Sequence, residues 1–447
     1  MTDTTATSAA PPAEIMPASA GYRSYALWLM LAIYTLNFLD RQVVNILAEP
    51  IKNDLGLKDW QLGALTGLAF AVFYTFLGIP IARLAERKNR PLIIAASLAT
   101  WSVFTVASGW AMNFVQLLLA RIGVGVGEAG CSPPSHSLIT DYTPKEKRAS
   151  ALAFYAMGIP LGSLAGMALG GLVADAHGWR IAFMVAGAPG LVLAVVAALT
   201  LREPRNQLAA AEAKAAESSP SFGEAMKELG TKRSFWLIAF ACSIVSFLGY
   251  GHLAFYGSFF FRNHAPQLAE LAQLAGGLGP AGLLGTSLGL IIGVFGALGT
   301  FIGGQIADRA ARKDIRAYVS VPAVAGLLGI PFFVTAMLTS NAVLAIGLLA
   351  VPTLLGSLWY GPVFAAVQSL VQPRTRATAA AVMLFIVNLI GLGLGPLVVG
   401  LLSDAFSASM GEAQGVRWAL LSSSAVGLVS ALLFWLARKT IREEIVS

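Results

Sequence analysis

Residues 114–142 read FVQLLLARIGVGVGEAGCSPPSHSLITDY, a stretch long and apolar enough to cross a bilayer that nevertheless contains Arg121 and Glu128. The two charges are seven positions apart, so on one helix they lie on the same face, about two turns from each other. Ser135 and His136 fall near the same stripe if the helix stays regular. A charge at mid-membrane costs about 2.5–3.5 kcal/mol on insertion scales, so this face is expected to border a polar interior and not lipid.

The composition of the whole chain is that of a polytopic membrane protein. Of its 447 residues, 56% are hydrophobic and only 12% are charged, against about 25% charged residues in soluble domains. The net charge of +7 does not predict nucleic-acid binding, because the basic residues lie mostly in short connections between apolar stretches. Cys131 and Cys242 both fall in apolar segments, which argues against a disulfide framework and a cysteine metal site.

Apolar runs of about 20 residues predict twelve membrane helices, six in each half of the chain. We expect them over residues 25–48, 62–82, 91–111, 115–139, 149–174 and 181–201, and then over 234–261, 283–307, 317–338, 341–371, 377–402 and 418–437. The fold class is therefore an all-α membrane protein built as two six-helix bundles.

Two polar regions and the chain ends complete the predicted organisation. The first residues lack both a basic start and a continuous apolar core, so we interpret them as a disordered tail and not as a signal peptide. Between the halves, LAAAEAKAAE favours a helix, SSPS interrupts it and FGEAMKEL favours a second short helix. Residues 263–282 could form either a loop or a short surface helix, and we expect the loop. The predicted units are a tail at 1–20, bundles at 21–201 and 234–438, a cytoplasmic linker at 202–233 and a tail at 439–447.

Lys and Arg residues set the expected orientation. The connections on the side of both termini, with the two tails, hold 23 of them, and the opposite side holds five. The positive-inside rule then predicts that both termini are cytoplasmic. We expect an integral, multi-pass protein of a bacterial inner membrane, acting as a monomer.

The two halves repeat each other in sequence. GQIADRAARK at 304–313 corresponds in position to GIPIARLAERK at 78–88, and GLLSD at 400–404 corresponds to GLVAD at 171–175. Such duplication is typical of transporters that bind a substrate between two halves and rock about it.

Twelve helices, a central cytoplasmic loop and the paired loops together resemble the major facilitator superfamily. The second loop fits its pattern G-x-x-x-D-R-x-x-R-K with Gly304, Asp308, Arg309 and Arg312, whereas the first has Ala82 in place of the acid. The resemblance implies that Asp308 caps a neighbouring helix and helps to latch the outward-facing state. It also places an N-half latch in doubt.

A narrower resemblance rests on three stretches. They are NFLDRQVVNILAEPIKNDLGL at 37–57, RIGVGVGEAGCSPPSHSLITDYTPKEKRASALAFY at 121–155 and AMGIPLGSLAGMALGG at 156–171. Together they are similar to the spinster-type members of the superfamily, whose animal representatives move sphingosine phosphate and lysophospholipids. The resemblance implies an amphiphilic lipid substrate of the lysophospholipid or sphingoid phosphate type, although substrate need not follow fold.

Four charged residues lie inside the predicted helices, away from their ends: Asp40, Arg41, Arg121 and Glu128. Asp40 and Arg41 point about 100° apart on a helix, so each is expected to find a partner on the fourth helix. One interpretation is structural, with two salt bridges fixing the first helix to the fourth. The other is proton coupling, with Glu128 as the first candidate for the carrier and Asp40 as the second. An arginine freed by protonation of its carboxylate then holds an anionic head group.

The second half carries no charge inside its predicted helices. Its candidate substrate-binding residues, which join Arg41 and Arg121, are Tyr250, His252, Tyr256, Tyr360 and Asn388. Ordinary helix packing is the competing explanation for each aromatic residue. As a set, they suit the apolar wall of a cavity that also holds charge, as an amphiphile requires.

Two other classes of function compete with lipid transport. A small organic anion or a drug-like solute could use the same acids and arginines, and a closed polar cavity would favour it over a lipid. An enzyme would need a nucleophile with histidine and acid, or a metal cluster, and four scattered histidines predict neither. We therefore expect no enzymatic activity, no metal and no cofactor.

Overall fold

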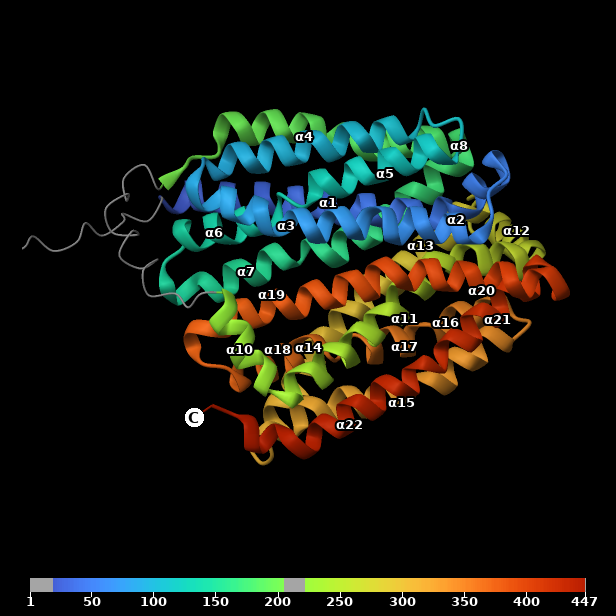
Figure 1. The fold of residues 1–447 in the computed structure, drawn as a ribbon. Coiled ribbons are helices and arrows are strands. Elements are labelled where there is room, and N and C mark those ends of the chain that lie inside the picture. The colour runs from blue at the N-terminus through green and yellow to red at the C-terminus, as the bar shows by residue number, and fades with distance from the viewer. Residues whose placement is uncertain (1–18, 205–221, 447) are drawn as a thin grey trace, which may run out of the picture.

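The computed structural model describes residues 19–204 and 222–446, which form helices and turns without any strand (Figure 1). Residues 1–18 of the tail predicted at 1–20, residues 205–221 of the predicted linker and residue 447 lie outside the described residues. The first half contains α1 Ala20–Leu55, α2 Asp59–Gly63, the π-helix η1 Ala64–Leu68, α3 Ala69–Arg87, α4 Arg90–Ser108, α5 Phe114–Glu128, α6 Ser132–Tyr142, η2 Lys145–Lys147, α7 Arg148–Ala156 and α8 Gly158–Thr200.

The second half follows α10 Phe222–Thr231, the short helix expected from FGEAMKEL. It contains α11 Arg233–Asn263, α12 Ala265–Leu274, α13 Pro280–Leu290, the π-helix η4 Ile291–Phe295, α14 Gly296–Ala311, α15 Ala317–Leu338, α16 Ala342–Leu348, α17 Ala350–Gly356, α18 Tyr360–Leu370, η5 Pro373–Thr375, α19 Arg376–Ile386, the π-helix η6 Val387–Leu394, α20 Gly395–Met410, α21 Glu412–Ser424 and α22 Val426–Glu444.

The described helices give the twelve membrane spans that the sequence predicts. Ten helical stretches are long and apolar enough to cross a membrane. One of them, Ser150–Thr200, contains two spans, because Gly178 adopts φ 83° and divides it. The remaining span is α1, whose 36 residues include the charged Asp40 and Arg41. The fold class predicted from the sequence is confirmed.

Two local expectations differ from the structure. The regular helix expected from residue 115 to 139 is interrupted after Glu128, and α6 begins only at Ser132, where two prolines lack the amides needed to continue α5. The loop expected at residues 263–282 contains the helix α12, which buries Leu268 and Ala272 on one face. In that segment the burial of two apolar side chains favours the helix over the loop.

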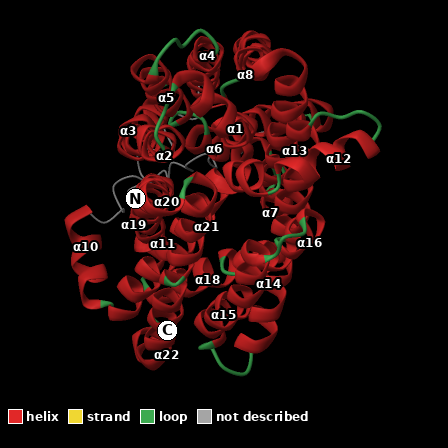
Figure 2. Cartoon of the chain, turned by 90° about the vertical axis from the view of Figure 1, so that its right-hand side faces the viewer, coloured by secondary structure: helices red, strands yellow, loops and turns green. Residues whose placement is uncertain are grey.

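Each half of the chain forms its own bundle, and α10 lies near the end where α1 begins (Figure 1). We call the end that carries Ala20 and Glu444 the terminal end, and the opposite end the far end. The end-on view shows the two groups of helices side by side (Figure 2). Helix α8 packs against α13, and α2 packs against α20, so these pairs form the interface between the halves.

Three clusters of buried apolar side chains form the core. One cluster lies mainly in the first half, around Phe70 and Trp101, and also includes Leu392 of the second half; another lies within the second half, around Phe235 and Phe434. The third contains residues of both halves, from α1, α8, α11, α13 and α20. The π-helices η1, η4 and η6 all belong to spans of the interface, and η1 contacts η6 directly.

A buried charge network fixes the terminal end of the first half. Arg90 opens α4 and is fully buried, and its guanidinium donates to Asp141 at 2.6 Å and to Glu203. The backbone amide of Arg90 also donates to Glu203 at 2.8 Å, so one carboxylate caps the helix and neutralises its first side chain. This network ties α4, α6 and the end of α8 together.

Substitution of this arginine tests the importance of the network. Arg90→Met removes the cation from two carboxylates, of which Glu203 is 5% exposed, so we expect the free energy of unfolding to fall by about 3–5 kcal/mol. Thermal unfolding of the purified protein in detergent, followed by tryptophan fluorescence, measures the change. Lys439→Met, at an exposed position of α22, serves as the control. Equal unfolding temperatures for the two variants would contradict this assignment.

Candidate functional site

An ion pair between α1 and α5 lies at the centre of the first half. The Nε of Arg41 donates to Oε2 of Glu128 at 2.7 Å, and the side chains are 12% and 0% exposed. The two residues come from separate spans, as expected for Arg41. A close, charge-assisted hydrogen bond offsets part of the cost of burying both charges.

Aromatic rings surround the Arg41 guanidinium on its remaining sides. Its central carbon lies 5.0 Å from the ring centre of Phe38, 4.7 Å from that of Phe70 and 4.6 Å from that of Tyr74. Each ring attracts the cation through its π electrons, with about 0.5–2 kcal/mol per contact depending on desolvation. The aromatic rings give the guanidinium favourable surroundings besides its bond to Glu128.

Asp40 has a different partner from the one predicted. Its Oδ2 accepts a hydrogen bond from Thr105 of α4 at 2.8 Å, and its Oδ1 has no hydrogen-bond partner. No ion pair joins Asp40 to Arg121 within the described part of the chain, so the expected second salt bridge to the fourth helix is absent there. The third span supplies the contact because α4 packs closely against α5.

Gly127 permits that close packing. A side-chain carbon at this position would lie 2.5 Å from the backbone nitrogen of Trp101 in α4. Only a glycine admits such an approach, and its neighbour in sequence is Glu128. Gly127 therefore lets α4 pack directly against α5 beside the Glu128 carboxylate.

Arg121 is buried and has unused donors. It is 1% exposed, and its Nε and Nη1 have no hydrogen-bond partner among the residues that the structure describes. Together with Arg41 it lines an enclosed cavity of about 20 Å³ between the halves, which is room for about one water molecule. The other lining residues are Phe38, Gln42, Asn45, Thr66, Phe70, Tyr250, Leu392 and Pro396. Two guanidinium groups, one of them unpaired, make this cavity suited to an anion.

The structure brings only part of the predicted second-half set to this cavity. Tyr250 lines it. His252 instead bonds to Ser423 at 3.0 Å and stacks on Phe333 at 4.4 Å between ring centres, inside the second half. The ring of Tyr256 lies 6.5 Å from that of His252, in the same surroundings.

The last two candidates do not line the enclosed cavity either. Tyr360 stacks on Trp359, with 4.1 Å between ring centres, and is 41% exposed. Asn388 lies half-buried in the π-helix η6. The predicted stripe beyond Glu128 is also altered by the break in the helix. There, Ser135 bonds to the carbonyl of Cys131 and His136 is exposed with its ring edge toward Tyr155.

The loop motif of the second half lies at the terminal end. Asp308 accepts a hydrogen bond from Tyr318 of α15 at 3.2 Å, so this contact stays within the second half. Arg309 and Arg312 are exposed, and Gly304 comes within 3.2 Å of where a side chain on Gly361 would lie. In this state Asp308 is bonded to its own half.

A second group of charges closes the far end. Arg262 of α11 donates to Glu49 of α1 at 2.7 Å and to Asp59 of α2 at 2.7 Å, and all three side chains are less than 10% exposed. Lys52 lies 3.1 Å from Asp59 and 2.9 Å from Glu412 of α21. All of these ion pairs except Lys52–Asp59 join the two halves. They could not be identified from the sequence, because their residues lie at the ends of the predicted spans or in the connections between them.

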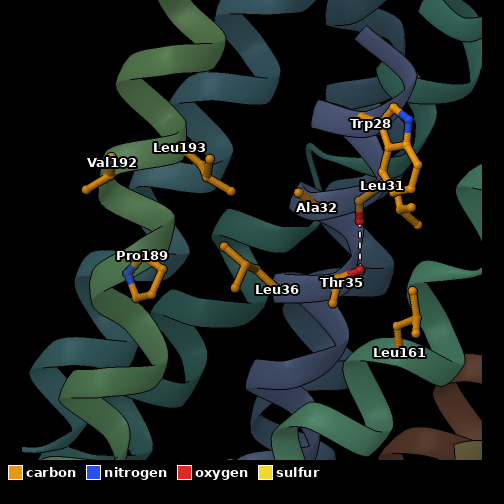
Figure 3. A pocket seen from close by; sticks show the side chains of 9 residues that line it. All are labelled: Trp28, Leu31, Ala32, Thr35, Leu36, Leu161, Pro189, Val192 and Leu193. Carbon is orange, nitrogen blue, oxygen red and sulfur yellow. Dashed lines mark hydrogen bonds between the residues drawn. The ribbon is translucent and has the colours of Figure 1, made fainter. Parts of the chain in front are cut away.

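An open groove of about 630 Å³ lies elsewhere, on the surface of the first half. Figure 3 shows its walls, which come from α1 and from both parts of α8. Its lining residues are Trp28, Leu31, Ala32, Thr35, Leu36, Leu161, Pro189, Val192 and Leu193. Because both walls belong to the same half, the groove is not a lateral opening between the halves.

Sequence reasoning missed the aromatic rings and the polar lining of the cavity. Phe70 and Tyr74 are four residues apart on α3, and Phe38 is three residues before Arg41. These spacings are also those of ordinary packing in a chain with 24 phenylalanines. Contacts between distant spans were needed to identify them. Among the described residues, no group of three or more His, Cys, Asp and Glu could hold a metal ion.

Comparisons with known proteins agree with this architecture. Residues 30–392 match the Major Facilitator Superfamily. An MFS-type efflux pump of Mycolicibacterium smegmatis is 34% identical over 421 residues, which cover 94% of each chain. Protein spinster homolog 1 of Mus musculus is 28% identical over 429 residues, covering 93% of this chain and 80% of the mouse protein.

A solved structure is also similar over nearly the whole length. It is the crystal structure of a bacterial homolog of the human lysosomal transporter spinster, in an inward-facing and unoccupied conformation. It superposes with a TM-score of 0.84 at 32% identity, covering 96% of this chain and 99% of the other. This chain therefore belongs to the major facilitator superfamily of membrane transporters and is similar to the spinster-type members of that superfamily.

Proposed function

We propose that this protein is a proton-coupled secondary transporter that moves a lysophospholipid or a sphingoid phosphate by alternating access. The observation that carries the proposal is the buried ion pair of Arg41 and Glu128 beside the unpaired guanidinium of Arg121. One carboxylate is positioned to exchange a proton, and two cations are positioned to receive an anionic head group. The lipid class is the one that the sequence resemblance to spinster-type members implies.

The proposed coupling follows from the geometry of the pair. When Glu128 binds a proton, its charge is lost and Arg41 keeps only the aromatic rings as partners. The guanidinium is then free to bind a phosphate oxygen in the cavity. When Glu128 releases the proton to the other side, it competes with the phosphate for Arg41. Asp40, which lacks an ion pair among the described residues, is the second candidate for the carrier.

The cavity supports an amphiphilic ligand over a purely polar one. Its lining combines Arg41 and Arg121 with the apolar side chains of Phe70 and Leu392. The head group is proposed to bind on the first half and the acyl chain to lie along the second, when the cavity is wider than in this closed form. A small organic anion or drug-like solute is the second candidate, favoured by the small volume of the cavity and by the efflux-pump relative.

The orientation follows from the distribution of Lys and Arg. With 23 on the side of the termini against five, the terminal end is proposed to be cytoplasmic and the far end extracytoplasmic, in a bacterial inner membrane. The ion pairs of Arg262 then close the extracytoplasmic side, as in an inward-facing transporter. We propose that the protein works as a monomer and is not an enzyme.

Removal of the proposed proton site is the direct test. Glu128→Gln keeps the shape of the side chain but cannot lose a proton, so we expect substrate uptake into vesicles to stop responding to an imposed pH gradient. The matched control is Glu146→Gln, at an exposed position near the terminal end. Gradient-driven uptake at the wild-type rate in Glu128→Gln would rule out this carrier.

A stability measurement separates proton coupling from a purely structural salt bridge. Arg41→Gln leaves the Glu128 carboxylate buried without its cation, so we expect a loss of about 3–5 kcal/mol in the free energy of unfolding. Arg41→Gln combined with Glu128→Gln removes both charges and is expected to recover most of that stability but no coupled transport. If the double variant regains both, the pair serves structure alone.

Ligand-dependent thermal shifts identify the substrate class. We expect lysophospholipids or sphingoid phosphates to raise the unfolding temperature of the purified protein, and Arg121→Ala to abolish this shift. Because the cavity left by this buried side chain lowers the unfolding temperature of the variant itself, the shift is measured against the same variant without ligand. Arg374→Ala, at an exposed position, controls for attraction of head groups to surface charge. Shifts with small organic anions alone would favour the second candidate.

A further inference from the structure

The repeated sequence G-L-x-x-D has no part in the proposed proton or substrate chemistry. It occurs once in each half, as GLVAD at 171–175 and GLLSD at 400–404. Both copies lie at the far end, on α8 and α20, the helices that face the other half. The contacts that the two copies make are the same.

Each aspartate caps the beginning of a helix in the opposite half. Asp175 accepts hydrogen bonds from the backbone amides of Ala281 at 3.2 Å and Gly282 at 2.6 Å, at the start of α13. Asp404 accepts them from the amides of Asp59 at 3.0 Å and Trp60 at 2.8 Å, at the start of α2. In both cases the two carboxylate oxygens bind successive amides.

The glycine four residues earlier makes room for the same helix end. A side-chain carbon at Gly171 would lie 2.1 Å from the carbonyl oxygen of Ala281, and one at Gly400 would lie 2.4 Å from the carbonyl oxygen of Asp59. These are the residues whose amides the two aspartates bind. The glycine admits the helix end and the aspartate binds it, one turn apart on the same helix.

The chemistry of a helix start explains why this contact stabilises one state. The first amides of a helix have no partner within the helix, and the helix dipole places partial positive charge there. A carboxylate is the side chain that satisfies both, and here it comes from the opposite half. Separation of the halves at the far end must break all four hydrogen bonds and return the amides and carboxylates to water.

We propose that Asp175 and Asp404 are paired gating residues, which hold the far end closed by capping α13 and α2 across the interface. The inference rests on the alternating-access part of the proposed function and is independent of its lipid and its proton. Because the two halves are duplicated, the two caps are related by a pseudo-twofold axis: each half supplies one capping aspartate and has one helix start capped by the other half.

The two caps differ in their surroundings. Asp404 is half-buried. The residue before it, Ser403, donates to the Asp59 side chain at 2.6 Å, and Asp59 in turn binds Arg262. Asp175 is exposed to solvent. Water weakens the second cap more than the first, so the cap of Asp404 contributes more to closure.

The experiment measures opening of the far end directly. In the full chain with Cys131→Ala and Cys242→Ala, spin labels at Met112→Cys and Ser340→Cys mark exposed positions of the far end in the two halves. Pulsed electron paramagnetic resonance in nanodiscs then gives the distribution of distances without substrate. We expect Asp404→Asn to raise the ratio of open to closed forms roughly 10-fold, because the amide oxygen accepts only one of the two hydrogen bonds, now without charge, and the NH2 group cannot accept the other. Asp175→Asn should raise it less, and the double variant more than either.

Two further variants decide between the outcomes. Asp54→Asn is the matched control, since Asp54 binds Arg180 at 2.5 Å at the far end but within the first half, and it should leave the distances unchanged. Gly171→Leu places a side chain against the opposite backbone and should open the far end. If Gly171→Leu opens it and the double asparagine variant does not, the caps are not gating contacts although the halves do move. If neither opens it, alternating access itself fails, and this inference with it.

Discussion

A charge inside an apolar bundle must find a partner within reach, and in this structure that requirement fixes how α1 and α5 lie against each other. Arg41 binds Glu128 at 2.7 Å, and the aromatic side chains of α1 and α3 enclose the guanidinium. Gly127 allows α4 to pack closely against α5, and Thr105 of α4 donates a hydrogen bond to Asp40. The packing of the first half is arranged around four charges that lipid could not solvate.

The two halves contribute different kinds of side chain to the cavity, as the cost of burying charge requires. The first half holds the buried charges of the cavity, whereas the second contributes Tyr250, Leu392 and Pro396 to its wall. Ion pairs that cross between halves are found at the far end, where Arg262 binds Glu49 and Asp59. The ion pair of Arg41 and Glu128 lies deep within one half, whereas the ion pairs that join the two halves lie at the far end, where the halves can separate.

Much of the fold could be predicted from the sequence, and the candidate site only in part. Span lengths and the duplicated motifs can be read from local sequence, so the twelve helices and the family could be predicted. The pairing of Arg41 with the fourth helix could also be predicted, from the balance of buried charges.

The partner of Asp40 could not be predicted, because a threonine on a neighbouring span does not stand out in an apolar segment. His252 is the opposite case: its polar side chain predicted a place in the cavity, but its contacts with Ser423 and Phe333 hold it within the second half. Contacts between distant spans depend on helix rotation, which composition does not encode.

The three π-helices lie in spans that form the interface between the halves. A π turn accommodates one residue more than an α turn and loosens the hydrogen-bond ladder at that point. In the second and eleventh spans these turns also face each other, η1 against η6. Each of these spans therefore has a built-in joint between its far-end portion and the rest. Thr66 of η1 and Leu392 of η6 line the cavity that holds Arg41, so a bend at these joints would change the shape of that cavity.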